Sequence, residues 1–229
     1  MNFYLRAAVI AAISYLLGSV NFACIFTKIF SGKDIRNYGS GNAGMTNVFR
    51  STGAVPGILT FAGDLLKVVV AIWISVSILG HENQGLVVLC RYISGFCCIL
   101  GHLYPVFFQF RGGKGVVVAA GTMLMVDWRV FLAAAVIFLV STLASRIVSL
   151  SSIIVAVAFP VLTFFFYDPV VDKPGELTQL MSFFYDDQKL LVTLLAALFA
   201  AVVVIKHILN IIRILHGEET RIFIKKREG

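Results

Sequence analysis

Long apolar runs separated by short polar segments dominate the pattern of hydrophobic and polar positions along the chain. The apolar residues are grouped and do not alternate at every second position, so the pattern favours helices over half-buried strands. A helix needs roughly 20 mostly apolar residues to span the hydrocarbon core of a bilayer. Candidate spans run over residues 3–24, 55–79, 86–108, 115–128, 130–145, 147–167 and 190–212.

These runs predict an all-α, polytopic membrane helix bundle, because a backbone exposed to hydrocarbon must satisfy its own hydrogen bonds. We predict seven transmembrane helices, with five or six as the alternative because the run 115–128 is short for a span. The first run is too long for the apolar part of an ordinary signal peptide, so we interpret it as a retained helix. Residues 1–229 are then expected to form a single domain.

The composition indicates a membrane protein, and the distribution of charge predicts its orientation in the membrane. Of the 229 residues, 59% are hydrophobic and only 14% are charged, whereas soluble domains carry about 25% charged residues. We therefore read the net charge of +7 as a signal of membrane orientation and expect no nucleic-acid partner. With seven spans, one side of the membrane would hold Lys28, Lys33, Arg36, Arg50, Arg111, Lys114, Arg146, Lys206, Arg213, Arg221, Lys225, Lys226 and Arg227. The other side would hold only Arg6, Arg129, Lys173 and Lys189. The positive-inside rule then predicts an outside (periplasmic) N-terminus and a cytoplasmic C-terminus.

The four cysteines all lie inside apolar runs, and none shows the spacing of metal ligands. Neither a disulfide framework nor a metal site is therefore predicted. The unusual polar segments instead fall on the predicted cytoplasmic side, in three separate parts of the chain.

The first polar segment is "NYGSGNAGMTNVFRSTG", residues 37–53. Its glycines, among them Gly41, can turn backbone N–H groups toward an anion. Neutral hydrogen-bonding groups are supplied by Ser40, Asn42 and Asn47, and Arg50 adds a planar fork that matches phosphate. The alternative is a flexible turn whose arginine merely obeys the positive-inside rule.

The second segment is "GHLYPVFFQFRGGKGVVVAAG", residues 101–121. Gly112 and Gly113 precede Lys114 directly before an apolar run, and a helix N-terminus there would favour a phosphate. The alternative is a plain turn with a lysine that extends to the membrane surface. His102 is an ionisable group within an apolar run, which marks a candidate functional residue; the alternative is a histidine that bonds a neighbouring helix.

The third segment is "KHILNIIRILHGEETR", residues 206–221. His207, Asn210 and Arg213 recur at helical spacing and predict a polar stripe at the end of the last helix. Gly217 is expected to end that helix, and Glu219 follows. The alternative is an ordinary interfacial helix end with solvated charges.

Together these segments resemble the bacterial integral-membrane glycerol-3-phosphate acyltransferases that use acyl-phosphate as donor. The resemblance lies in "GSGNAGMTN" followed by Arg50, in "GHLYPVFFQFRGGKGV" and in "NIIRILHGEE", and it covers nearly the whole chain. It implies an enzyme of the bacterial inner membrane, with a cytoplasmic active site, that makes lysophosphatidic acid from glycerol 3-phosphate.

The resemblance also implies the site residues and the partners. As catalytic residues it implies His102, Lys114, Arg50 and Ser40. As substrate-binding residues we expect Gly41, Asn42, Asn47, Gly112, Gly113, Asn210, Arg213, Glu219 and His207. The expected partners are acyl-phosphate, glycerol 3-phosphate, membrane lipids and the soluble enzyme that makes acyl-phosphate; no cofactor is expected.

Two questions stay open at this point. The attacking hydroxyl must lose a proton, either to His102 or to a phosphate oxygen of a substrate, and we favour the substrate because most site residues are donors or neutral groups. An H-x-x-x-x-D mechanism is excluded, since no histidine has aspartate five positions later. The alternative from another functional class is a membrane transporter of a phosphate-bearing anion, but no internal repeat is visible.

Overall fold

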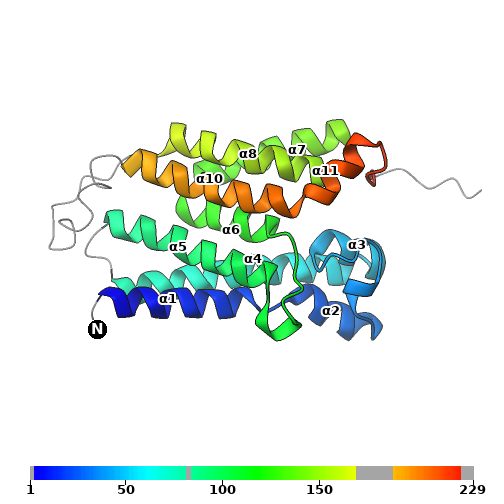
Figure 1. Cartoon of the computed structure of the whole chain (residues 1–229), viewed down its shortest axis with the longest axis horizontal. Coiled ribbons are helices and arrows are strands. Elements are labelled where there is room, and N and C mark those ends of the chain that lie inside the picture. Colours follow the sequence, from blue (N-terminus) through cyan, green and yellow to red (C-terminus); the bar gives the residue numbers. More distant parts are fainter. Residues whose placement is uncertain (1–2, 81–83, 169–187, 223–229) are drawn as a thin grey trace, which may run out of the picture. The chain divides into compact units, whose positions relative to one another are not determined.

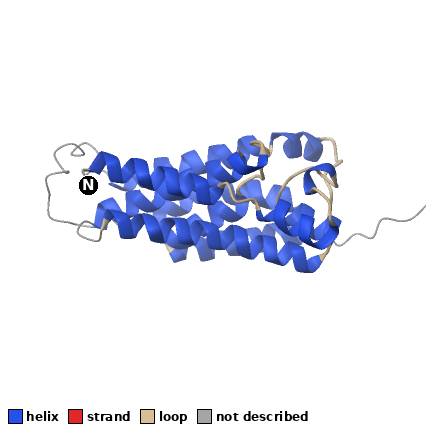
Figure 2. Ribbon diagram, turned by 90° about the horizontal axis from the view of Figure 1, so that it is seen from below, coloured by secondary structure: helices blue, strands red, loops and turns tan. Residues whose placement is uncertain are grey.

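The computed structural model describes residues 3–80, 84–168 and 188–222, and every regular element in this part of the chain is helical (Figure 2). The expected all-α membrane class is thereby confirmed. The described chain forms two compact units, and each is treated separately below. Unit 1 includes residues 3–126, and unit 2 includes residues 127–168 and 189–222.

Unit 1 is built from long apolar helices with shorter elements between them (Figure 1). Its elements are α1 (Phe3–Gly18), α2 (Phe22–Ser31), η1 (Ile35–Asn37), α3 (Met45–Thr52), α4 (Ala54–Leu79), α5 (Gln84–Leu103), η2 (Val106–Phe108) and α6 (Val116–Val126). Helix α4 packs against α1, α3, α5 and α6, so it forms the centre of this unit. Asn21 begins α2 by accepting a hydrogen bond from the Cys24 backbone, and Gly32 ends it in a left-handed conformation.

Small residues let α1 and α5 approach each other closely. A Cβ atom added at Gly18 would collide with the backbone oxygen of Cys98, and one added at Gly101 would collide with that of Tyr15. Such contacts bring backbones together and are typical of helix packing in membranes, where no hydrophobic effect drives helices together. The contact fixes the end of α5, and therefore the position of His102.

Three buried serines join α1, α4 and α5 in the middle of unit 1. The Ser14 Oγ lies 2.8 Å from the Ser94 Oγ and 3.2 Å from the Ser75 Oγ, and Ser75 donates to Ser94 at 3.0 Å. Each hydroxyl can both donate and accept, so the three groups satisfy one another without water.

Unit 2 consists of α7 (Trp128–Ser145), α8 (Val148–Phe166), α10 (Gln188–Lys206) and α11 (Ile208–Leu215). Helices α7 and α8 form a tightly packed hairpin, closed by Arg146 in a left-handed conformation. At the other end, Arg129 donates to the backbone oxygen of Phe166 at 2.7 Å. The run 190–212 was expected as one helix, but it is divided at His207 into α10 and α11.

Six segments of the described chain are long and apolar enough to cross a membrane. They are Tyr4–Ser31, Ala54–Leu79, Gly85–Phe108, Trp128–Ser145, Val148–Phe166 and Gln188–Lys206. The seventh predicted span forms α6, whose 11 residues extend about 16 Å. A straight crossing needs about 30 Å, so the count of seven and the orientation built on it stay predictions. Lys173 and residues 225–227, which entered the charge comparison, lie outside the described residues.

Candidate active site

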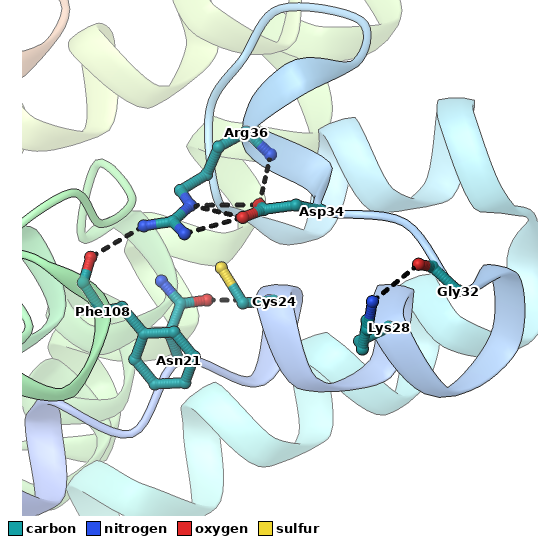
Figure 3. A network of polar contacts seen from close by, with 7 residues as sticks. All are labelled: Asn21, Cys24, Lys28, Gly32, Asp34, Arg36 and Phe108. Carbon is teal, nitrogen blue, oxygen red and sulfur yellow. Dashed lines mark hydrogen bonds and ion pairs between the residues drawn. The ribbon is translucent and has the colours of Figure 1, made fainter.

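The two polar segments of unit 1 are joined by an arginine clamp (Figure 3). Asp34 caps η1 by accepting from the Arg36 backbone at 3.0 Å, and its carboxylate also holds the Arg36 side chain. The Arg36 Nη1 donates to the backbone oxygen of Phe108 at 2.7 Å. Because Phe108 ends η2, this bond holds the segment that leads to the GGKG turn against the first polar loop.

The clamp also changes the acidity of its carboxylate. The side-chain hydrogen bond from Arg36 lowers the pKa of Asp34, although partial burial acts in the opposite direction. From the sequence, Arg36 is expected only as one of the positive charges on the cytoplasmic side, and this structural role is not predicted. The local signal was the Asp-x-Arg spacing, but nothing in the sequence pointed to Phe108 as the third partner.

Asn47 organises the first polar loop from inside. Its side-chain oxygen accepts from the Ser40 backbone at 3.1 Å, and its Nδ2 donates to the backbone oxygens of Tyr38 and Asn42 at 2.9 and 3.0 Å. The Gly41 N–H donates to the Tyr38 oxygen at 3.0 Å. The loop itself thus uses the Gly41 amide, and the expected role of Gly41 in substrate binding stays a prediction.

The GGKG turn folds back on the end of α5. The N–H groups of Gly112 and Gly113 donate to the backbone oxygens of Leu103 and His102, at 3.2 and 3.1 Å. These carbonyls would otherwise lack partners at a helix C-terminus. The two glycine amides thus cap α5, and the expected role of Gly112 and Gly113 in substrate binding stays a prediction. Lys114 follows at once and lies next to the N-terminus of α6, whose first-turn N–H groups have no intrahelical acceptor.

A buried network of charged side chains lies beside this turn. Lys67 on α4 has its Nζ 2.6 Å from the Asp64 Oδ1, 2.9 Å from the His102 Nδ1 and 2.9 Å from the Val20 backbone oxygen. The Asp64, Lys67 and His102 residues are 2%, 5% and 5% exposed. Asp64 and Lys67 stand three positions apart on α4, and nothing in the sequence connects this pair to His102.

Gly113 leaves room for the other ring nitrogen of His102. A Cβ atom added at Gly113 would collide with the His102 Nε2, and it would lie 2.7 Å from the backbone oxygen of Ala43 in the first loop. The Nε2 atom thus lies where the first loop and the GGKG turn meet. Any side chain at position 113 would occupy this junction.

Cationic and hydroxyl groups of unit 1 surround the two loops. Arg50 is exposed in the last turn of α3, and its guanidinium makes no hydrogen bond or ion pair within the described residues. Ser40 is exposed at the tip of the first loop, and Asn42 and Lys114 are half-buried. These groups can bind oxyanions because they supply positive charge and donors without adding a carboxylate.

In unit 2, Glu219 gathers three polar side chains. Its Oε1 accepts from the Ser149 Oγ at 2.7 Å and from the Asn210 Nδ2 at 2.8 Å, and its Oε2 accepts from the Arg213 Nε at 2.9 Å. Burial alone would raise the pKa of Glu219, but the three hydrogen bonds outweigh it and lower the pKa below 4.5. Within the described residues the Arg213 Nη groups form no hydrogen bond, so its planar fork can bind phosphate.

The structure thus brings the predicted residues Asn210, Arg213 and Glu219 together and adds Ser149 of α8. His207 has a different setting, at the break between α10 and α11. Its Nδ1 lies 2.7 Å from the Val203 backbone oxygen. A carbonyl can only accept, so this contact places a proton on the His207 Nδ1. Across the described residues, no group of three metal-ligating side chains occurs.

The fold and these side chains define a class: a multi-pass membrane enzyme whose polar groups suit anionic substrates. A family model described as "Glycerol-3-phosphate acyltransferase" matches residues 8–217, and the chain belongs to this family. The resemblance noted from the three motifs is confirmed, and membership decides against the transporter alternative.

Relatives cover most of the chain. It is 37% identical to the glycerol-3-phosphate acyltransferase of Syntrophomonas wolfei over 95% of this chain and 98% of that protein. It is 43% identical to glycerol-3-phosphate acyltransferase 2 of Lactobacillus acidophilus over 72% of this chain and 76% of that protein. Among solved structures, PlsY (YgiH), an integral membrane glycerol 3-phosphate acyltransferase, matches in its glycerol 3-phosphate form with a TM-score of 0.74. The identity is 34%, and the match covers 94% of each chain.

Proposed function

We propose that this enzyme transfers a fatty acyl group from acyl-phosphate to the 1-hydroxyl of sn-glycerol 3-phosphate. The products are 1-acyl-glycerol 3-phosphate (lysophosphatidic acid) and inorganic phosphate, in the first step of phospholipid biosynthesis. The acceptor and product are supported by the PlsY structures, which are described as glycerol 3-phosphate and lysophosphatidic acid forms. The proposed place of the reaction is the cytoplasmic face of the bacterial inner membrane.

One observation carries the proposal of acyl-phosphate as the donor. The loops of unit 1 present Arg50, Lys114 and Ser40, whereas Asp64, the carboxylate beside His102, is paired with Lys67. A site rich in cations and poor in bases suits a donor that is already activated. Acyl-phosphate is such a mixed anhydride, and phosphate is a good leaving group, so no acyl-enzyme intermediate is needed.

The chemical step follows from these groups. The hydroxyl oxygen of glycerol 3-phosphate attacks the acyl carbonyl carbon, and a tetrahedral oxyanion forms. The bond between this carbon and the bridging phosphate oxygen then breaks, and inorganic phosphate leaves. The hydroxyl proton passes to a phosphate oxygen of a substrate. Lys114 and Arg50 neutralise the negative charge that develops on the oxyanion and on the leaving phosphate, and Ser40 orients a substrate oxygen. Catalysis therefore rests on positioning and electrostatics.

In unit 2, we assign Arg213 to a substrate phosphate, with Glu219 as the group that holds its side chain and Asn210 as a donor that holds Glu219. Asn42 is assigned to a substrate hydroxyl and Asn47 to the support of the loop. The fatty tail stays in the hydrocarbon region, which explains why a membrane enzyme performs this reaction. A soluble enzyme that makes acyl-phosphate is the proposed supplier of the donor.

The purified protein tests the donor directly. Radiolabelled glycerol 3-phosphate is incubated with palmitoyl-phosphate, palmitoyl-CoA or palmitoyl-acyl-carrier protein, and lipid-soluble label is measured. We expect labelled product with palmitoyl-phosphate alone. Equal or faster product formation from either thioester would contradict the proposed donor and leave the family assignment intact. The matched inactive control is Lys114→Met, which removes one proposed phosphate ligand with little change in size.

A further inference from the structure

The buried network of Asp64, Lys67 and His102 determines which ring nitrogen of His102 carries a proton. The Lys67 Nζ lies 2.6 Å from the Asp64 Oδ1, 2.9 Å from the His102 Nδ1 and 2.9 Å from the Val20 backbone oxygen. A lysine ammonium has three N–H groups and no lone pair. The hydrogen bonds of this ammonium go to the His102 Nδ1 and the Val20 backbone oxygen, and its charge pairs with the Asp64 carboxylate.

The partners leave His102 one favourable protonation state. A protonated Nδ1 would point an N–H at the ammonium of Lys67, whereas an unprotonated Nδ1 accepts a hydrogen bond from it. The Asp64 Oδ1 also lies near the Nδ1, at 3.5 Å, but the Lys67 Nζ is closer, at 2.9 Å, and the shorter contact determines the state of the Nδ1. The Asp64 carboxylate and the Lys67 ammonium neutralise each other, as buried charges must. His102 is then neutral, with its single ring proton on Nε2.

The Nε2 atom faces the reaction region of unit 1. It lies against Gly113, at the junction of the GGKG turn and the first loop near Ala43. No hydrogen bond to the Nε2 is made within the described residues, although His102 is only 5% exposed. An Nε2–H at this junction is therefore available to donate a hydrogen bond to a ligand oxygen.

We propose that the Asp64–Lys67 pair holds His102 as the Nε2–H tautomer, so that His102 donates a hydrogen bond to a substrate oxyanion and is not the general base. Lys67 and Asp64 are positioning residues that act through His102. This inference rests on the proposed function, in which a substrate phosphate oxygen accepts the hydroxyl proton. His102 adds a hydrogen-bond donor at the loop junction without adding positive charge.

The tautomer can be measured without any substrate. The full chain is labelled with ¹⁵N-histidine and placed in lipid nanodiscs, and long-range ¹H–¹⁵N correlations show which ring nitrogen is protonated. The His102 signal is identified by its loss in His102→Gln. We expect the proton on Nε2 in the wild type, and a proton on Nδ1 would overturn the proposal.

Two variants test the control by Lys67. In Lys67→Met the Nδ1 loses its donor, so we expect a mixture of tautomers. That variant leaves Asp64 buried without a partner and can fail to fold, so Asp64→Leu/Lys67→Met removes both charges with apolar groups of similar size. A mixture of tautomers in this double variant supports the proposal. The unchanged wild-type tautomer would show that the pair does not determine it.

Kinetics separate a donor from a base. The amide of Gln can reach near the Nε2 position and donate, but it cannot accept a proton as a base. We expect His102→Gln to retain turnover within about tenfold of wild type at saturating substrates, and His102→Ala to lose roughly 100-fold, as when one oxyanion donor is removed. Equal losses in both variants would overturn the donor role. Absence of acyl transfer in the wild type would instead refute the proposed function and leave the tautomer result standing.

Discussion

His102 and His207 carry the same ring, but their neighbours impose opposite states. The His207 Nδ1 faces the backbone oxygen of Val203 and must donate, whereas the His102 Nδ1 faces the ammonium of Lys67. The chemical character of a buried histidine is set by the group that fixes one of its nitrogens. The sequence alone does not distinguish these two states.

Glu219 allows a prediction at the scale of one residue. Its pKa is lowered in the folded protein, so its hydrogen bonds stabilise the segment after α11 at neutral pH. This stabilisation is present above the ordinary value of 4.5 and is lost as the pH falls through the lowered value in the fold. We expect the protection of the amides of residues 217–222, measured by hydrogen exchange corrected for its intrinsic pH dependence, to fall at acid pH in the wild type.

The variant Glu219→Gln provides the comparison. It cannot pair with Arg213 as an anion, so the same amides should exchange faster already at neutral pH, by an amount that corresponds to about 1–3 kcal/mol. Its exchange should also lose the acid-dependent change that belongs to Glu219. The neighbouring exposed Glu218→Gln is the control and should behave as wild type. An identical acid response in wild type and Glu219→Gln would rule out Glu219 as its source.

At the scale of elements, Arg36 holds η1 and η2 together (Figure 3). Arg36→Met removes the bonds to Asp34 and Phe108 and should release the segment 105–115. We expect limited proteolysis to cut this segment faster, and the free energy of unfolding to fall by about 1–3 kcal/mol. Lys28→Met, which removes another cation bonded to a backbone oxygen, at Gly32, is the control. Wild-type cleavage in Arg36→Met would contradict the clamp.

The close contact of α1 and α5 gives a second prediction at this scale. Gly18→Ala places a Cβ atom against the backbone of Cys98, so the helices must separate. We expect a lower melting temperature, measured with a thiol-reactive dye that reports exposure of the buried Cys90 and Cys98. Ala12→Ser, at an exposed position of α1, adds an atom without this collision. Equal melting of both variants would show that the contact is not needed.

The sequence was sufficient to predict the helices and the segments that carry polar chemistry. Apolar runs predicted the positions of the long helices, and glycine-rich motifs identified the loops. It was not sufficient to predict hydrogen-bond partners. The amides of Gly112 and Gly113 cap α5 because the chain turns back after Pro105, and the bond from Arg36 to Phe108 joins residues 72 positions apart. Such pairings depend on which residues come close together in the folded chain, and the periodicity of the sequence does not show this.

At the scale of the whole molecule, the membrane topology is the property to test. Single cysteines are introduced by Ser40→Cys, Lys114→Cys and Arg213→Cys in a chain whose native cysteines are alanine. We expect an impermeant maleimide to label all three only after the inner membrane is opened. Arg129→Cys, on the predicted outer side, should react in intact cells. Labelling of any of the first three from outside would contradict a common cytoplasmic face.

The short helix α6 has a consequence for the traffic of lipids. An 11-residue helix covers about half of the hydrocarbon thickness, so one of its ends lies at depth or the bilayer thins around it. With the N-terminal end beside Lys114 at depth, the proposed substrates can meet there. Glycerol 3-phosphate would reach it from water and acyl-phosphate from the hydrocarbon, and neither would cross a full leaflet. The proposed product, lysophosphatidic acid, would then leave laterally into the bilayer, and its acyl chain would stay among the lipid chains throughout.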